Sequence, residues 1–333
     1  MLTTAIVTLL IIGIVMYNFF KYPNPNNNVK VYRLKLAAQR NILVLGICAL
    51  LPATVFGVSL VYGLITNGLS FGIVGQALTT MWDIWYVYAV MVVISIVMSM
   101  RQLGTLDKEI VKMTKKGKEQ DIFTGAKPAS DNMQRDVADM CRYLGIKNVP
   151  TVMVLPANGL PNAFAIGTLD GKSAIALHGK LVNGLHADET NAVIAHELGH
   201  ITSGDTQVRF LLSNLGWMRW LLYLGMLFAL PTSFWGVLFV LGGIILTQIV
   251  LAPIAALMGL AIARRAEFNA DAVAVEMQNS GAGMSNALLK LEAMYLSEAP
   301  LMMEQAGKMS RWYMMHPPTT ERVNAARKLD NKD

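Results

Sequence analysis

The most informative stretch of the chain is Ala192-Val193-Ile194-Ala195-His196-Glu197-Leu198-Gly199-His200-Ile201. Its polar residues form the pattern H-E-x-x-H, and the residues around them are uncharged, as a buried helix requires. Positions i and i+4 of a helix share a face, so His196 and His200 can both reach one metal ion. Glu197 lies beside them and can take a proton from an attacking water. A helix with two ordinary surface histidines is the plainer alternative, but it fits the uncharged flanks less well. The stretch therefore predicts a buried helix that holds zinc.

A catalytic zinc needs a third protein ligand, and the residues alone leave this choice open. His178 and His186 precede the motif without supporting spacing, so lining a turn or capping a helix is the plainer interpretation of both. Glu267 and Asp271 are one helical turn apart and would face the same way. Glu267 could then bind the metal, and Asp271 could accept the second N–H of a ligand histidine. An amphipathic helix with two solvated acids explains the same spacing equally well.

The composition indicates a membrane protein. Hydrophobic residues make up 54% of the 333 residues and charged residues only 15%, with a mean hydropathy of +0.43. A soluble domain carries about a quarter charged residues, so this shortfall points to lipid rather than to a larger core. The apolar content excludes disorder, and a chain with only two cysteines cannot be a disulfide-stapled fold.

Five apolar segments are close to the length that crosses a bilayer. They are Thr3–Phe20, Ile42–Ile65, Trp82–Met100 and the two halves of a hairpin over residues 211–263. We expect the hairpin to turn at Pro231-Thr232-Ser233 rather than at Gly242-Gly243, because Pro and Ser interrupt the apolar pattern. The first segment lacks a basic n-region and an A-x-A-like cleavage site, which favours a retained span over a signal peptide.

The distribution of Lys and Arg predicts the orientation of these spans. Residues 21–41 and 101–120 are basic, residues 66–81 carry no charge, and Arg264-Arg265 directly follow the last span. Basic loops stay in the cytoplasm, so we expect the amino terminus outside and both long polar regions inside. The net charge of +6 then reflects orientation and attraction to anionic headgroups, and we expect no nucleic-acid partner.

The polar regions predict a compact mixed α/β unit. Residues 132–144 have helical periodicity closed by Gly145, three β-like runs follow at 151–155, 163–167 and 173–177, and Asp188 is a good N-cap for the motif helix. The predicted fold class is an α+β membrane protein with about five transmembrane helices and a mostly helical cytosolic domain that carries a small β-sheet. The predicted regions are 1–100 with three spans, 101–210 with the zinc helix, the hairpin 211–263, and the cytosolic part 264–333.

The ordered set of motifs resembles the HtpX-like membrane zinc endopeptidases, which belong to the wider gluzincin family with the CAAX prenyl endopeptidases. The likeness covers about residues 130–333 and includes HELGH at 196–200, two apolar spans, E-F-x-A-D at 267–271, and Met315-His316-Pro317-Pro318. It implies that His196, His200 and Glu267 bind one Zn²⁺ per chain, with Glu197 as the general base. It also places His316 near the substrate carbonyl. By itself, a histidine beside Pro-Pro is more often structural.

The resemblance further implies that Asn162-Ala163-Phe164 forms an edge strand that pairs with a bound peptide. It implies cleavage of misfolded or damaged membrane proteins, as part of stress response and quality control, on the cytosolic side of a bacterial inner membrane. The expected partners are therefore polypeptide substrates and the lipid bilayer. The known bacterial proteins have two spans before the catalytic region whereas we expect three here, so residues 1–100 have no assigned role.

Two other classes of function compete with this interpretation. A transporter would place ionisable groups inside its spans, and here only Arg219 is a candidate. A catalytically idle zinc-binding scaffold or holdase would not need Glu197 as a base. Both alternatives therefore explain less of the sequence than a peptidase does.

Overall fold

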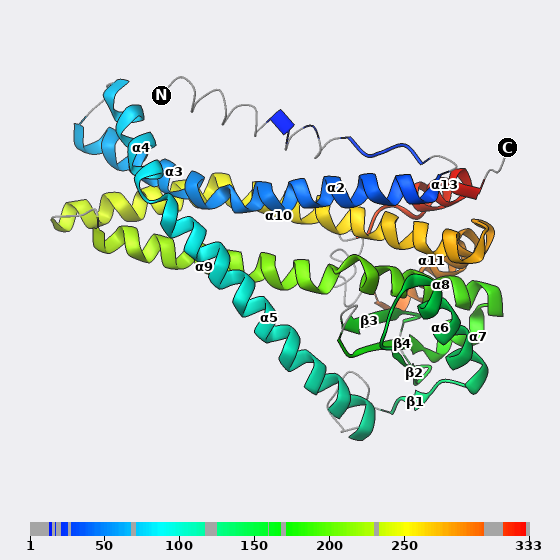
Figure 1. Ribbon diagram of the computed structural model, residues 1–333. Coiled ribbons are helices and arrows are strands. Elements are labelled where there is room, and N and C mark those ends of the chain that lie inside the picture. The colour runs from blue at the N-terminus through cyan, green and yellow to red at the C-terminus, as the bar shows by residue number, and fades with distance from the viewer. Residues whose placement is uncertain are drawn as a thin grey trace. The chain divides into compact units, whose positions relative to one another are not determined.

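The computed structural model describes Gly13, Ile14, Tyr17 and residues 21–25, 28–67, 71–116, 125–158, 160–167, 171–229, 233–302 and 316–330. These residues form two compact units that alternate along the chain (Figure 1). The apolar unit comprises residues 1–21, 41–100 and 208–262, and the α/β unit comprises residues 22–40, 101–207 and 263–333. Residues 22–40 thus lie in the unit that carries the H-E-x-x-H motif, although the sequence analysis grouped them with the membrane region.

The apolar unit is built from helices. They are the second part of α2 (Val29–Cys48), α3 (Leu50–Asn67), α4 (Phe71–Asp83), and parts of α5 (Trp85–Lys116), α9 (Asp205–Ala229) and α10 (Phe234–Gln278). Its surface is apolar, with Trp217 and Trp235 more than 60% exposed. Its interior holds a polar contact, in which Asn214 Nδ2 donates to Ser99 Oγ at 2.9 Å. Apolar side chains outside and a hydrogen-bonded polar pair inside suit a helical unit embedded in lipid.

Three helical stretches among the described residues are long and apolar enough to cross a membrane. They are Val29–Thr66, Trp85–Leu106 and Phe234–Gln278. The first and last of these contain the predicted second and fifth spans, and Trp85–Leu106 contains the predicted third span from Trp85 onward. Most of the first segment lies outside the described residues. The structure differs at the predicted fourth span, because α9 is not one of these stretches. Its Asn214 and Arg219 lower the hydropathy of an otherwise apolar helix.

The two helices of the predicted hairpin begin and end at other residues than the apolar pattern indicates. Helix α9 ends at Ala229, α10 begins at Phe234, and Gly242 and Gly243 lie inside α10, which excludes them as the turn. Of the preferred turn, residues 231 and 232 lie outside the described residues, and Ser233 directly precedes α10. Helix α10 then continues through Arg264 and Arg265 to Gln278 without a break. Glu267 and Asp271 are therefore carried by the same helix as the apolar segment.

The α/β unit contains a four-stranded sheet. Its strands are β1 (Lys127–Pro128), β2 (Thr151–Leu155), β3 (Ala163–Gly167) and β4 (Ser173–His178), in the spatial order β1-β2-β4-β3. Strands β2 and β4 are parallel, and β1 and β3 pair antiparallel to them at the two edges. The three longer strands confirm the β-like runs expected from the sequence.

The two faces of the sheet pack against different helices because side chains alternate along each strand. Val152, Ile175 and Leu177 pack against α6 (Asp131–Leu144) and α8 (Ala187–Ser203). Met153 and Ala176 on the opposite face pack against Ile110 of α5. The central strands are buried on both faces, which explains their nearly continuous apolar sequences.

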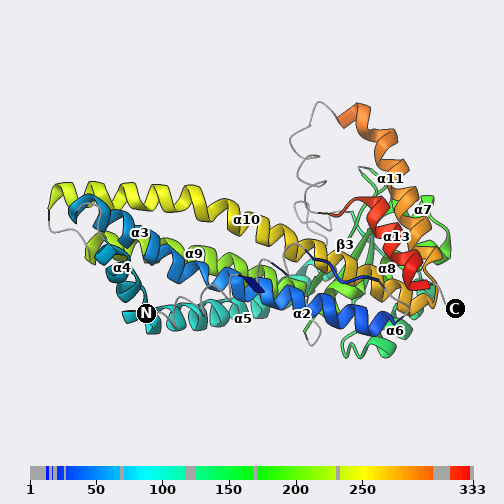
Figure 2. The ribbon, with the colours of Figure 1, turned by 90° about the horizontal axis from the view of Figure 1, so that it is seen from above.

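Three further helices complete this unit: α7 (Gly179–Gly184), α11 (Ala282–Met302) and α13 (Thr319–Asp330). Helix α11 packs against both α8 and α13 (Figure 2). The first part of α2 also belongs here, because Tyr32 and Leu36 are buried against Phe268 and Ala272 of α10. The helix that carries the H-E-x-x-H motif is thus enclosed by the sheet, α6, α10 and α11.

Candidate metal centre

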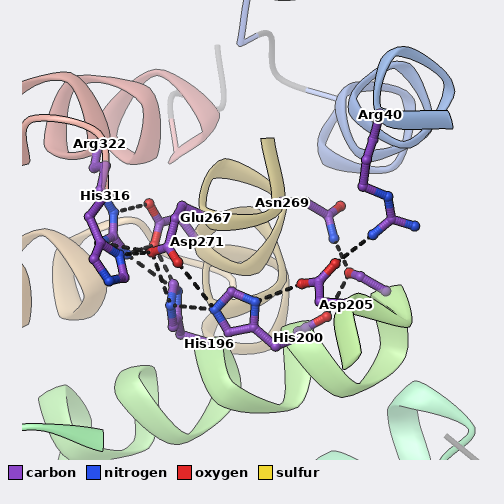
Figure 3. A network of polar contacts seen from close by, with 11 residues as sticks. Arg40, His196, His200, Asp205, Glu267, Asn269, Asp271, His316 and Arg322 are labelled. Carbon is purple, nitrogen blue, oxygen red and sulfur yellow. Dashed lines mark hydrogen bonds and ion pairs between the residues drawn. The ribbon is translucent and has the colours of Figure 1, made fainter. Parts of the chain in front are cut away.

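Helices α8 and α10 bring the two predicted motifs face to face. Gly199 of α8 makes this possible, since a Cβ at this position would lie 2.7 Å from the Cα of Ala270 on α10. A glycine is required where two helix backbones approach this closely. The contact places the helical turn from His196 to His200 opposite the turn from Glu267 to Asp271 (Figure 3).

His196, His200 and Glu267 point their ligand atoms at one another. The Nε2 atoms of the two histidines are 3.2 Å apart. Glu267 Oε2 lies 3.7 Å from Nε2 of His196, and Glu267 Oε1 lies 3.6 Å from Nε2 of His200. Tetrahedral zinc with bonds of about 2.0–2.1 Å separates its ligand atoms by about 3.3–3.5 Å. The donor set and its spacing therefore fit a zinc ion, and these are the described residues that form such a group.

His196 is held from behind by a buried acid and a buried arginine. Its Nδ1 lies 2.9 Å from Asp271 Oδ1, which directs Nε2 toward Glu267 and His200. Arg322 of α13 holds Asp271 with two hydrogen bonds, from Nε at 2.8 Å and from Nη2 at 2.6 Å. Asp271 and Arg322 are 1% and 7% exposed. A carboxylate that orients a ligand histidine in this way fixes its tautomer and raises its basicity.

His200 has a similar support, which the sequence analysis missed. Its Nδ1 lies 2.7 Å from Oδ2 of Asp205, the first residue of α9. The other oxygen of Asp205 accepts a hydrogen bond from Nη1 of Arg40 on α2 at 2.6 Å. The turn that brings Asp205 back to His200 uses Gly204 in the left-handed region, with φ of 69°. An acid five residues after the second histidine is a signal in the sequence, but nothing in the sequence links it to Arg40.

The charges around these ligands shift their pKa values. Burial by itself lowers the pKa of His200, but the hydrogen bond to Asp205 and the charges of Glu267 and Glu197 raise it to about 9 in the metal-free protein. Burial likewise opposes the charge of Arg322, yet Asp271 and Glu267 raise its pKa above the usual value. Zinc binds the neutral form of a histidine, so His200 would release a proton on binding it at neutral pH.

The two residues expected to do chemistry lie at this centre. Glu197 is 6% exposed, and its charge reaches both His200 and Arg322. His316 precedes α13, and its Nδ1 lies 2.8 Å from Oε2 of Glu267. Arg322 Nη1 approaches the same oxygen at 3.2 Å. Glu267 is therefore the residue on which both histidines of α8, His316 and Arg322 converge.

The other candidate histidines lie away from this centre. His178 is the N-cap of α7, and burial followed by the charge of Lys180 lowers its pKa. His186 is the N-cap of α8, and its backbone N–H donates to the carboxylate of Glu189 at 2.8 Å. The expectation that Asp188 caps this helix was therefore wrong by two residues. Both histidines cap helices, as the plainer interpretation held.

The edge strand β3 begins with Ala163 and Phe164, directly after Asn162. Helix α8 packs against this strand, so it lies beside the motif helix. Strand β3 pairs with β4 on one side, and no strand pairs with its other side among the described residues. The Asn162 side chain accepts from the N–H of Ala163 at 2.9 Å, which fixes the start of the strand. β3 is therefore an edge strand of the sheet that the described residues form.

A His-His-Glu centre, in a chain with bilayer-length apolar helices, defines a membrane metallopeptidase. The chain belongs to peptidase family M48, whose model matches residues 129–330. The match extends from the loop before α6 to the end of α13, and so contains all residues of the candidate centre except Arg40.

Several curated relatives carry the name Protease HtpX homolog. The chain is 31% identical over 210 residues to the one from Gemmatimonas aurantiaca, covering 58% of this chain and 74% of the relative. It is 32% identical over 222 residues to the one from Streptococcus gordonii, covering 58% and 71%. It is 31% identical over 217 residues to the one from Pyrococcus abyssi, covering 58% and 71%. The crystal structure of S. mikatae Ste24p aligns with 76% of this chain and 65% of its own, with a TM-score of 0.46 and 18% identity.

Proposed function

We propose that the chain is a membrane-embedded zinc endopeptidase that cleaves peptide bonds by general-base-assisted attack of water. The observation that carries this proposal is the convergence of His196, His200 and Glu267 on one point, with Glu197 buried beside them. Family membership supports the same reaction class. Neither a transporter nor a holdase requires a buried base next to such a centre.

The chain's own residues divide the chemistry among them. A zinc ion held by His196, His200 and Glu267 supplies a Lewis acid that polarises the scissile carbonyl and makes water more acidic. Glu197 takes the proton of the attacking water and delivers it to the leaving amine. His316 stabilises the negative charge that develops on the carbonyl oxygen. Asp271 and Asp205 hold the two histidine rings so that each Nε2 stays directed at the metal position.

Substrate would bind as an extended chain along the edge strand β3. Backbone hydrogen bonds to the strand give affinity with little dependence on sequence. The side chain of Asn162 fixes the start of the strand, and Ala163 and Phe164 are its first two residues. Such recognition suits unfolded polypeptides, and we propose misfolded or damaged membrane proteins as the substrate class.

The decisive experiment separates zinc binding from hydrolysis. Glu197→Gln keeps the size of the side chain but removes the base, so zinc content should stay near one per chain while casein cleavage falls by at least ~10²-fold. His316→Ala should also keep zinc and slow cleavage by about 10²–10³-fold, because it removes a group that stabilises the oxyanion. Casein cleavage by Glu197→Gln at the rate of the parent protein would exclude this mechanism. Client binding without cleavage by the parent protein would favour the holdase.

We also propose a bacterial inner-membrane location with the amino terminus outside and the centre in the cytosol. The basic segments 21–41 and 101–120 and the uncharged segment 66–81 support this orientation. With Cys48 and Cys141 replaced, a single cysteine at Gly68 should react with an impermeant probe on intact cells, and one at Lys116 should not. The opposite labelling pattern would place the centre on the other side of the membrane.

A further inference from the structure

Helix α2 contacts the candidate metal centre through the side chain of Arg40. Arg40 Nη1 donates to Oδ1 of Asp205 at 2.6 Å, and Oδ2 of the same carboxylate lies 2.7 Å from Nδ1 of His200 (Figure 3). The two oxygens of Asp205 are thus divided between the arginine and the histidine. Arg40 stands outside the region that matches the family model.

We propose that Arg40 is a positioning residue of the zinc site, which it supports by fixing Asp205 against His200. This inference rests on the proposed zinc site and assigns a role to a segment that had none. Arg40 touches no ligand atom itself. It acts by holding the carboxylate that holds the ring of His200.

The location of the pair distinguishes it from a solvated surface ion pair. The side chains of Arg40 and Asp205 are 12% and 14% exposed. One turn before Arg40, Leu36 is 1% exposed and packs against α10, which limits how far the guanidinium can move. A partly buried charge pair with an anchored cation orders its carboxylate better than an exposed pair of flexible side chains.

Asp205 needs such a partner because of its position in the chain. It follows Gly204, whose φ of 69° ends α8 one residue before α9 begins. A carboxylate at the start of a helix can satisfy the free backbone N–H groups of that helix instead of facing His200. A cation on the far side of the carboxylate keeps it directed toward the ring, and hence keeps Nδ1 of His200 protonated and Nε2 free for the metal.

Helix α2 supplies a matched control. Arg33 lies seven residues before Arg40 on the same face and donates to Glu276 of α10 at 2.5 Å. This pair also fastens α2 to the α/β unit, but it contacts none of the ligand residues. Arg33→Leu and Arg40→Leu therefore remove the same charge from the same helix and differ in their connection to His200.

The test measures zinc affinity of the full-length protein in detergent, by competition with a chromophoric chelator. Asp205→Asn should weaken zinc binding by about 10–100-fold, as loss of a carboxylate behind a ligand histidine does. Arg40→Leu should weaken it by about 10-fold, Arg40→Lys by less, and Arg33→Leu should match the parent protein. The double variant Arg40→Leu/Asp205→Asn should bind zinc no more weakly than Asp205→Asn. Both changes interrupt the same series of contacts, from Arg40 through Asp205 to His200.

Thermal melting shows whether Arg40 positions Asp205 or only stabilises the packing of α2. With excess chelator, Arg33→Leu and Arg40→Leu should lose similar stability. Added zinc should raise the melting temperature of Arg33→Leu as much as that of the parent, and that of Arg40→Leu by less. Equal zinc affinity for the two arginine variants would overturn the inference, and Arg40 would then only stabilise the packing of α2. A parent protein without zinc affinity would overturn the proposed function as well, whereas zinc binding without peptidase activity would overturn only the proposed hydrolysis.

Discussion

Each of the two histidines proposed as zinc ligands is supported by an aspartate that is held by an arginine. The two supports differ in strength. Behind His196, Arg322 holds both oxygens of Asp271, and these two side chains are 8% and 2% exposed. Behind His200, Arg40 holds one oxygen of Asp205, and their exposures are 12% and 14%. The first support is buried and fixed at two points, and the second is a single contact nearer to solvent.

This difference follows from where each support originates. Asp271 and Arg322 come from α10 and α13, which pack against each other and against the motif helix inside the α/β unit. Arg40 is 165 residues away from Asp205 in sequence and comes from the amino-terminal helix. A buried charged cluster is costly to break, whereas a half-open pair can change at small cost. The structure thus combines one rigid ligand histidine with one whose orientation depends on α2.

The largest expected effect comes from removing Glu267, the proposed ligand that lies beside both supported histidines. Glu267→Ala should reduce bound zinc from about one per chain to near zero, because a zinc site with two protein ligands is too weak to persist in purified protein. Peptidase activity should disappear with the metal. Metal analysis of purified protein and a casein assay measure both.

Glu276→Ala is the matched control. It removes a carboxylate from the same helix, but this carboxylate pairs with Arg33 outside the centre. Its zinc content should equal that of the parent. Full retention of zinc in Glu267→Ala would mean that the two histidines are completed by another group.

The second prediction tests the unequal strength of the two supports directly. In the zinc-free protein, Asp271→Asn should lower the free energy of unfolding by about 3 kcal/mol, because it leaves the buried Arg322 without its bidentate partner. Asp205→Asn should cost only about 1 kcal/mol, because Arg40 makes a single contact to Asp205 and its side chain is already 12% exposed to solvent. Denaturation in detergent with excess chelator, monitored by circular dichroism, measures both values. Equal losses would show that burial does not distinguish the two supports.

The sequence predicted much of this centre because its main residues lie on regular elements. His196 and His200, and likewise Glu267 and Asp271, are separated by one helical turn, so each spacing implies a common face. The strands β2, β3 and β4 were also predicted, since apolar runs bounded by turn residues report local structure. The roles of Glu197 and His316 remain predictions that rest on the family likeness and on their position.

The sequence could not predict the partners that come from distant elements. Arg40 was interpreted only as part of a basic segment that sets membrane orientation, which explains its charge without reference to any contact. Asp205 has no helical spacing to His200, because Gly204 ends α8 between them. The extent of α10 was also missed, since hydropathy reports where apolar residues stop and not where a helix ends.

The last prediction concerns the contact between Gly199 and Ala270, which sets the spacing of α8 and α10. Gly199→Ala would add a Cβ 2.7 Å from the Cα of Ala270, so α8 and α10 would have to move apart. Overpacking of this kind costs about 1–3 kcal/mol in unfolding free energy. It should also weaken zinc binding, because both histidines would retreat from Glu267. Gly259→Ala is the control, since a Cβ there meets no atom within 4 Å and alanine favours the α10 helix. If Gly199→Ala bound zinc as tightly as Gly259→Ala, the spacing of the two helices would not set the geometry of the centre.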